Sequence, residues 1–208
     1  MYSVKATGEE SGTWESHHWQ ERMAVFNQSS RQADIVMLGD SITEYADWDE
    51  RFPDIRIANR GIAGDTTSGM LRRVTSVLSV HPKKVFVLAG INDLLGEHRK
   101  VEFILGNYSK LLSALVDGGP EVTVIATLPC NSMLVKDCRP DQVTALNSGL
   151  AKLAVGKIRF VDPTTALSDH GQLAERFTPD GIHLNNQGYG VVAGVLAPFM
   201  RLQVGPSQ

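Results

Sequence analysis

The sequence predicts an α/β fold in three layers, α/β/α, around a five-stranded parallel sheet. Five short apolar runs rich in Val, Ile and Leu have the length and composition of buried parallel strands. Segments with helical periodicity separate most of these runs, which implies right-handed βαβ crossovers. The chain has 208 residues, enough for one substantial domain and cramped for two.

The order of elements follows from where the apolar runs and the helical patterns fall. The expected strands cover residues 33–39, 55–60, 84–90, 121–128 and 158–162. The expected helices cover residues 14–29, 66–80, 100–117, 140–155 and 186–202. The connection after the first strand is rich in Asp and Trp and has little helical pattern. We therefore expect a single domain over residues 1–208, with a core at about 33–195 and an N-terminal helix at about 14–29.

Composition and charge limit the classes of protein to which the chain can belong. With 42% hydrophobic and 21% charged residues the chain has an ordinary globular composition, and its net charge of −3 argues against nucleic acid as the main partner. No apolar run approaches the roughly 18 residues of a membrane span. We expect no stable membrane insertion and, for the chain as written, a cytoplasmic protein. A trimmed signal peptide would leave the same sequence.

The two cysteines, Cys130 and Cys138, lie eight residues apart in one loop. A disulfide between them is one alternative, and two free thiols are the expected state. Their spacing is not that of a metal site, and no two histidines have the helical i, i+4 spacing of a zinc site. We expect neither a metal nor another cofactor.

Small and hydrogen-bonding residues recur where the first three predicted strands end. The first strand runs into Gly39-Asp40-Ser41, the second into a glycine-rich segment that contains Gly64, and the third into "GIND", which contains Asn92. In parallel α/β sheets, ligands bind outside the carboxyl ends of the strands. The chemistry is therefore expected at this edge of the sheet.

Ser41 has the partners that a nucleophilic serine requires. A neutral hydroxyl needs an imidazole to accept its proton, and a carboxylate usually orients that imidazole. Asp180 and His183 lie three positions apart in a turn-prone segment and can form this pair. Candidate donors to an oxyanion are the backbone N–H of Ser41, the backbone N–H of Gly64 and the side-chain amide of Asn92.

A structural alternative exists for the same serine. Ser41 followed three residues later by Glu44 fits the helix capping box. The hydroxyl cannot both cap a helix and point at His183 in the reactive state. If the serine is the nucleophile, its Oγ should face His183, and Glu44 should lack the reciprocal capping bond.

The four clusters "GDS", "NRGIAGD", "GIND" and "DGIHLN" resemble, in order and spacing, the four motif blocks of the SGNH hydrolases, also called the GDSL esterase/lipase family. The resemblance covers about residues 33–195, with Ile42 in place of the usual Leu. It implies a flavodoxin-like sheet, no metal, and ester hydrolysis through an acyl-enzyme on Ser41. It also implies His183 as general base and then acid, Asp180 as its orienting acid, and Ser41, Gly64 and Asn92 as oxyanion donors.

Within that family the chain looks most like bacterial esterases related to platelet-activating-factor acetylhydrolase, which implies small acyl groups. We expect a serine esterase acting on short-chain esters, acetyl esters in particular, of a carbohydrate or a small lipid. The alternatives are an acyltransferase using the same acyl-enzyme, a lysophospholipase or thioesterase, and, least favoured, a non-enzymatic binding module. The expected partner is a small-molecule ester, and a homodimer stays open.

Further residues are candidates for contact with the substrate. Asp40 either holds the turn, which we favour, or takes part in the chemistry. Tyr45 and Trp48 either line a substrate pocket or pack within their connection. Three residues of neighbouring loops are candidates for an apolar wall: Leu95, Met133 and Leu134.

Overall fold

The computed structural model describes residues 12–29 and 31–202 and contains a parallel sheet in the order β2-β1-β3-β4-β5. Its strands are β1 (Ile35–Gly39), β2 (Ile57–Gly61), β3 (Lys84–Leu88), β4 (Glu121–Ile125) and β5 (Ile158–Val161). Gly39 pairs with Gly61 on one side and with Leu88 on the other, so β1, β2 and β3 end side by side. The predicted fold class is confirmed.

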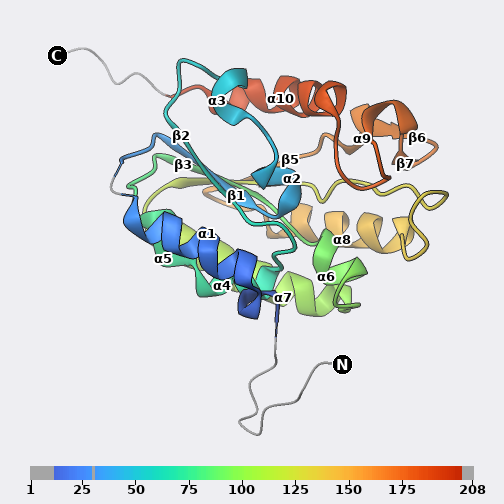
Figure 1. Ribbon diagram of the computed structural model, residues 1–208, viewed down its shortest axis with the longest axis horizontal. Helices are drawn as coiled ribbons and strands as arrows, with labels where there is room; N and C mark the ends of the chain where they lie inside the picture. The colour runs from blue at the N-terminus through green and yellow to red at the C-terminus, as the bar shows by residue number, and fades with distance from the viewer. Residues whose placement is uncertain (1–11, 30, 203–208) are drawn as a thin grey trace, which may run out of the picture.

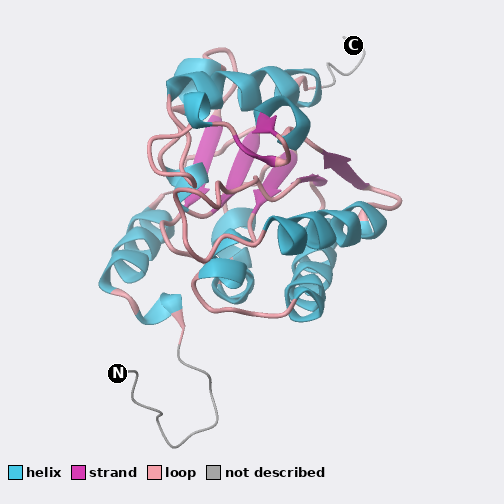
Figure 2. Cartoon of the chain, turned by 90° about the vertical axis from the view of Figure 1, so that its right-hand side faces the viewer, coloured by secondary structure: helices cyan, strands magenta, loops and turns pink. Residues whose placement is uncertain are grey.

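Helices cover both faces of the sheet, so the described chain has three layers (Figures 1 and 2). In Figure 1, α10 and the short helix α3 lie above the sheet, and α1, α4, α5, α7 and α8 lie below it. The longer helices are α1 (His17–Gln28), α7 (Val101–Asp117), α8 (Pro140–Leu153) and α10 (Asn186–Met200). The shorter ones are η1 (Thr13–Glu15), α2 (Ser41–Glu44), α3 (Trp48–Arg51), α4 (Thr67–Arg72), α5 (Val74–Leu78), α6 (Ile91–Leu95), α9 (Thr164–Leu167) and η2 (Glu175–Phe177), and a hairpin joins β6 (Ser168–Asp169) to β7 (Gln172–Leu173).

All five predicted strands and all five predicted helices occur within a few residues of their expected bounds, except that one predicted helix is divided in two. The helix expected over 66–80 is divided into α4 and α5 at Arg73, whose φ of −119° is not helical. The ends of the domain expected over residues 1–208 lie outside the described residues.

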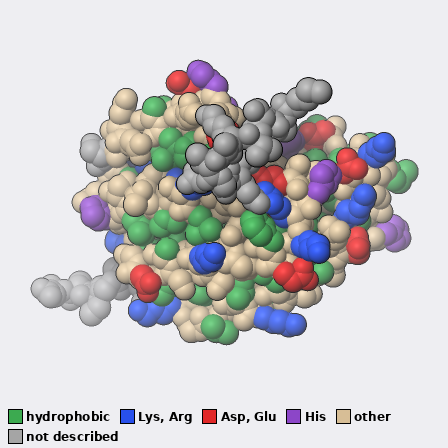
Figure 3. All heavy atoms as spheres, turned by 90° about the horizontal axis from the view of Figure 1, so that it is seen from below, with side chains coloured by type: hydrophobic (Ala, Val, Ile, Leu, Met, Phe, Trp, Pro, Cys, Tyr) green, Lys and Arg blue, Asp and Glu red, His purple; other side chains and the backbone are tan. Residues whose placement is uncertain are grey.

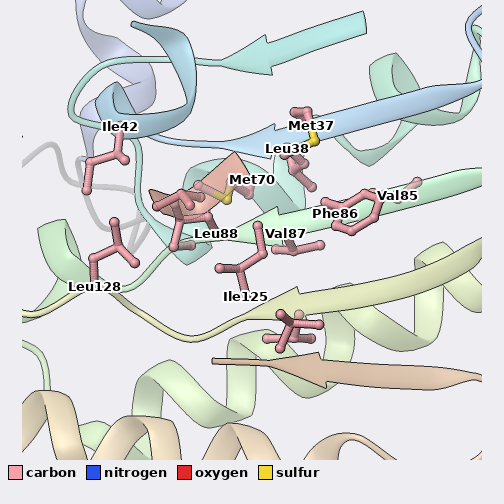
Figure 4. Packing of buried hydrophobic residues seen from close by; sticks show 14 of the residues in the cluster. Met37, Leu38, Ile42, Met70, Val85, Phe86, Val87, Leu88, Ile125 and Leu128 are labelled. Atoms are coloured by element: carbon pink, nitrogen blue, oxygen red, sulfur yellow. The ribbon is translucent and has the colours of Figure 1, made fainter. Parts of the chain in front are cut away.

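The apolar core lies between the sheet and both helical layers. All five residues of β1 are buried, as are the last four residues of β3 and of β4. Figure 4 shows side chains of these strands, such as Leu38, Val87 and Ile125, packed together with Met70 of α4. Removal of this apolar surface from water is the main contribution that stabilises the fold.

One buried arginine ties the ends of the two neighbouring strands β1 and β2 to the turn that follows β2. The Arg73 guanidinium has no exposed surface and donates to the Asp65 carboxylate (2.7 Å), the Arg60 carbonyl (2.8 Å) and the Gly39 carbonyl (3.0 Å). Burial raises the pKa of Asp65 and lowers the pKa of Arg73, and the charge of each partner opposes that shift. The ion pair with Asp65 therefore offsets part of the cost of burying the two charges.

Two further carboxyl groups are buried near the carboxyl ends of the strands. Asp40 accepts a hydrogen bond from the Ile42 N–H at 3.0 Å, while its Oδ2 atom has no hydrogen-bond partner among residues 12–29 and 31–202. Burial, reinforced by the charges of Asp65 and Asp93, raises the pKa of Asp40 from 3.8 to about 7. Burial likewise raises the pKa of Asp93 to about 6, although Thr67 donates to it from both its hydroxyl and its N–H.

The expectation of two free thiols is wrong, because Cys130 and Cys138 form a disulfide. The loop between β4 and α8 turns back on itself over residues 131–137, which brings the two Cα atoms to 5.9 Å, within the range that a disulfide spans. The spacing of eight residues in the sequence does not by itself show that the loop reverses its direction, so the disulfide was not predicted.

The molecular surface on the lower side of Figure 1 carries basic, acidic and histidine side chains interspersed with one another (Figure 3). Over the described residues, no helix combines the length and the apolar character needed to cross a membrane. Nor do the side chains of those residues form a group of three or more His, Cys, Asp or Glu suited to a metal ion.

Replacing Arg73 with Leu should destabilise the protein strongly. Asp65 would remain buried without its counter-charge, at a cost of about 3–5 kcal/mol in the free energy of unfolding. Urea unfolding would measure the loss. The matched control is Arg176→Leu, which breaks the half-exposed pair with Asp169 and should cost at most ~1 kcal/mol. Equal losses for the two variants would contradict the role of Arg73.

Replacing Asp40 with Asn should change how stability depends on pH. The pKa of Asp40 is higher in the folded state than its ordinary 3.8, so the folded protein binds a proton that the unfolded chain releases between pH 4 and about 7. The free energy of unfolding of the wild type should therefore fall across that window. Unfolding curves from pH 4 to 8 should show the Asn variant gaining roughly 2–4 kcal/mol relative to the wild type as pH rises. Parallel pH profiles would rule the shift out.

Candidate active site

Ser41 begins the one-turn helix α2 directly after β1 and is buried. The helix folds tightly over the strand because residue 39 is glycine: a Cβ there would lie 2.0 Å from Thr43 Oγ1 and 2.7 Å from the Leu88 carbonyl. Asp40, not Ser41, is the residue that caps this helix, through its hydrogen bond from the Ile42 N–H. The Ser41 hydroxyl is therefore free for another partner.

That partner is His183. Ser41 Oγ lies 2.9 Å from His183 Nε2, and His183 Nδ1 lies 2.6 Å from Asp180 Oδ2. The predicted contact between Ser41 and His183 is confirmed. Because Asp180 accepts the proton on Nδ1, Nε2 can accept the proton of the serine hydroxyl. The three side chains thus form one hydrogen-bonded chain from α2 to the segment that precedes α10.

The backbone around Asp180 holds its carboxylate against the ring. Asp180 Oδ1 accepts from the N–H groups of Ile182 (3.0 Å) and His183 (2.8 Å). Partial burial opposes ionisation, but the hydrogen bonds from the His183 ring and from these two N–H groups outweigh it and lower the pKa of Asp180. Gly181, with φ of +88°, provides the left-handed turn between the two side chains.

Gly64 and Asn92 lie in the segments that follow the neighbouring strands. A turn closed by the Asp65 N–H and the Ile62 carbonyl (3.0 Å) carries Gly64 at φ of +79°, the left-handed conformation that glycine adopts readily. Asn92, in the first turn of α6, donates one amide hydrogen to the Asp65 carbonyl at 3.0 Å. Within the described residues, the N–H groups of Ser41 and Gly64 have no protein acceptor.

The capping box is absent. Glu44 Oε2 accepts from the Ala63 N–H at 2.6 Å, and its carboxylate also contacts Arg22 and His18 of α1. Among the described residues, Glu44 makes no hydrogen bond to Ser41. The prediction that Glu44 lacks the reciprocal capping bond is confirmed.

The other residues predicted to contact the substrate differ in how exposed their side chains are. Tyr45 is 55% exposed and its ring centroid lies 5.5 Å from that of His183. Met133 and Leu134 are 82% and 51% exposed and belong to the disulfide-closed loop, and Leu95 is half-buried at the end of α6.

Asp40 and Trp48 have structural roles and do not contact the open site. Asp40 is 1% exposed and caps α2, so its carboxyl does not reach the surface of the site. Trp48 is 3% exposed, because its ring packs in the core while its Nε1 donates to the Thr43 carbonyl at 3.1 Å. Neither side chain can line a substrate pocket in this arrangement.

Sequence reasoning missed several residues that support the site. The Tyr189 hydroxyl of α10 donates to the Ile42 carbonyl at 2.8 Å and fixes α2 from above. The Thr178 hydroxyl accepts from the Gly181 N–H at 2.8 Å, and the Asn131 N–H donates to the Gly181 carbonyl at 2.9 Å. A threonine two positions before Asp180 is a recognisable turn signal; the other two contacts have no local signal.

Comparison with known proteins connects this geometry to a family. A model of the GDSL-like lipase/acylhydrolase family matches residues 37–191. The α2 subunit of platelet-activating factor acetylhydrolase IB from Rattus norvegicus is 26% identical over 191 residues, which cover 86% of this chain and 80% of that one. The N-acylneuraminate cytidylyltransferase of Escherichia coli is 25% identical over 181 residues, but the chain spans only 42% of its length.

Solved structures agree with the family match. A candidate acylhydrolase from Bacteroides fragilis has a TM-score of 0.77 and 25% identity, over 89% of this chain and 97% of the other. A carbohydrate esterase family 3 protein from Talaromyces cellulolyticus shares the fold, with a TM-score of 0.68 and 20% identity over 81% and 96%. Since the family match covers most of the sequence, the chain belongs to the GDSL-like lipase/acylhydrolase family and is a carboxylic ester hydrolase.

Proposed function

We propose that the protein is a serine esterase that hydrolyses short-chain esters, O-acetyl esters above all, through an acyl-enzyme. The observation that carries the proposal is the hydrogen-bonded chain from Ser41 through His183 to Asp180, with distances of 2.9 and 2.6 Å. This is the arrangement in which an imidazole activates a serine hydroxyl and a carboxylate holds the imidazole in the required tautomer.

In acylation, Ser41 Oγ attacks the ester carbonyl carbon while its proton passes to His183 Nε2. Asp180, ionised because its pKa is lowered, stabilises the imidazolium that forms. The carbonyl oxygen becomes an oxyanion that accepts hydrogen bonds from the backbone N–H groups of Ser41 and Gly64 and from the second amide hydrogen of Asn92. The intermediate then collapses, and His183 returns the proton to the departing alcohol.

In deacylation, His183 takes a proton from water as the water oxygen attacks the acyl carbon. Collapse of this second intermediate breaks the bond to Ser41 Oγ, which recovers its proton from His183 and releases the carboxylic acid. The His183 side chain is 32% exposed, so water can reach it for this step.

Two exposed apolar side chains lie at the rim of the site. The Tyr45 ring lies beside His183, and Leu134 lies beside Gly181. The relative from Rattus norvegicus is named as an acetylhydrolase, which supports an acetyl ester. We place O-acetylated carbohydrates and small lipid esters first among the substrates.

The proposal is tested with p-nitrophenyl esters from C2 to C12 and acetylated sugars. The wild type should prefer the C2 ester, and Ser41→Ala should reduce kcat by about 10⁴- to 10⁶-fold, because nucleophile and base act as a unit. Ser148→Ala, which removes an exposed hydroxyl of α8, is the control and should keep full activity. A preference for long chains would refute the substrate class, and an active Ser41→Ala variant would refute the mechanism. Formation of a new ester with an added sugar acceptor would identify an acyltransferase.

Replacing Asn92 with Ala should lower kcat by about 100- to 1,000-fold, the cost of losing one oxyanion donor. The hydrogen bond to the Asp65 carbonyl is lost at the same time, so thermal unfolding must accompany the kinetics. Asn147→Ala is the matched control, because its amide also bonds to the backbone, at Thr127 in the segment that follows β4. A loss in kcat below tenfold for Asn92→Ala would exclude Asn92 as an oxyanion donor.

A further inference from the structure

Glu44 joins two parts of the site that are separate in the sequence. It lies on the same helical turn as Ser41, three residues further on, and its Oε2 accepts from the Ala63 N–H at 2.6 Å. Ala63 directly precedes Gly64 in the turn after β2. One side chain therefore connects the helix that carries the nucleophile to the turn that carries a candidate oxyanion donor.

The helix and the turn lie in direct contact, which makes this connection short. A Cβ on Gly61 would lie 2.2 Å from the Glu44 backbone nitrogen and 2.5 Å from its Cα, so only glycine lets α2 rest on the end of β2. The side chain of Glu44 is 12% exposed, which shields its hydrogen bond to Ala63 from water. A hydrogen bond to a charged, shielded acceptor is stronger than one between neutral groups.

The carboxylate is itself held from the other side by α1. His18 Nε2 lies 2.9 Å from Glu44 Oε2, and Arg22 Nε lies 3.1 Å from Oε1. Oε2 thus accepts hydrogen bonds and Oε1 has an ion-pair partner, since the Arg22 contact is an ion pair without hydrogen-bond geometry. Rotation of the side chain away from Ala63 would break all three contacts. Helix α1 therefore restrains the Glu44 side chain, although it contributes no group to the proposed reacting centre.

The other end of the same turn is fixed independently. The Asp65 carboxylate accepts from Trp19 of α1 at 3.2 Å and from Arg73 at 2.7 Å, and the Asp65 carbonyl accepts from Asn92. Gly64 lies between the two anchored residues, Ala63 and Asp65. A Cβ at Gly64 would meet no atom of the described part of the chain within 4 Å, so no packed side chain from that part fixes the glycine itself. The position of its N–H therefore depends on the anchors on either side.

We propose that Glu44 is a positioning residue that sets the Gly64 N–H relative to Ser41, and that α1 holds Glu44 in place through Arg22 and His18. This inference rests on the proposed function, since it assumes that Gly64 stabilises the oxyanion. Loss of the Ala63 hydrogen bond lets the turn move, which weakens a contact made mainly in the transition state. The loss therefore falls on kcat and leaves KM nearly unchanged.

The test compares Glu44→Ala, Glu44→Gln and Arg22→Ala with the wild type on p-nitrophenyl acetate. Removing one oxyanion donor costs about 10²- to 10³-fold in kcat, and a displaced donor should cost less, roughly 10- to 100-fold in Glu44→Ala with KM within about threefold. Glu44→Gln keeps an oxygen that can accept from Ala63 and should recover activity to within about fivefold of wild type. Arg22→Ala should fall between the two.

A second measurement separates positioning from general loosening of the fold. A trifluoromethyl ketone forms a tetrahedral adduct with the serine, and its oxygen occupies the place of the oxyanion. Its inhibition constant should weaken in the same proportion as kcat/KM across the Glu44 and Arg22 variants. The control is Glu121→Ala, which removes a half-exposed glutamate paired with Lys84 and Arg159 away from the site and should change neither quantity.

The outcomes separate the two proposals. If Ser41→Ala is inactive but Glu44→Ala and Arg22→Ala keep kcat within threefold, the inference is wrong and the proposed function stands. If Ser41→Ala retains activity, the proposed function itself fails. If Glu44→Ala does not fold, Glu44→Gln and Arg22→Ala decide: unchanged inhibition constants together with unchanged kcat in both would overturn the inference.

Discussion

The buried guanidinium of Arg73 is the interaction on which the geometry of the site depends. It binds the Gly39 carbonyl at the end of β1, the Arg60 carbonyl near the end of β2 and the Asp65 carboxylate in the next turn. These three acceptors flank the positions of Ser41 and Gly64. The buried guanidinium is tolerated because each of its three nitrogens donates to an acceptor and one of these acceptors is a carboxylate. The edge of the sheet that carries the candidate active site is therefore held by a polar network as well as by the apolar core.

Next to that network, three of the candidate catalytic groups lie on short structural elements. Ser41 begins a single helical turn, Asn92 lies in another, and Gly64 sits in a turn fixed at both ends. Groups held in this way need little reorganisation when charge develops on the substrate oxygen, and such preorganisation is a large part of enzymatic catalysis. His183 is the exception, because it comes from a loop and is oriented by Asp180 and the turn at Gly181.

Much of this arrangement could be predicted from the sequence. Strand and helix patterns are periodic and local, so the sheet and the longer helices followed from them. The pairing of Ser41 with His183 followed instead from what a nucleophilic serine requires and from the resemblance of the four motif blocks to the SGNH hydrolases. The disulfide could not be predicted, because it depends on how the loop between Cys130 and Cys138 reverses its direction. The role of Asp40 as the helix cap required knowing where α2 begins. The partners of Glu44 come from α1, more than 20 residues away, and no local pattern encodes contacts between distant segments.

The loop closed by the Cys130–Cys138 disulfide lies beside the candidate site and restricts how its backbone could adapt to a substrate. Met133 and Leu134 lie inside the ring closed by Cys130 and Cys138, and the Asn131 N–H ties that ring to the Gly181 carbonyl. A segment fastened at so many points has little conformational entropy left to lose when a ligand arrives. Under the proposed function, the backbone of this loop would keep one shape towards different alcohols, and rotation of the exposed Met133 and Leu134 side chains would be its main means of adapting to them.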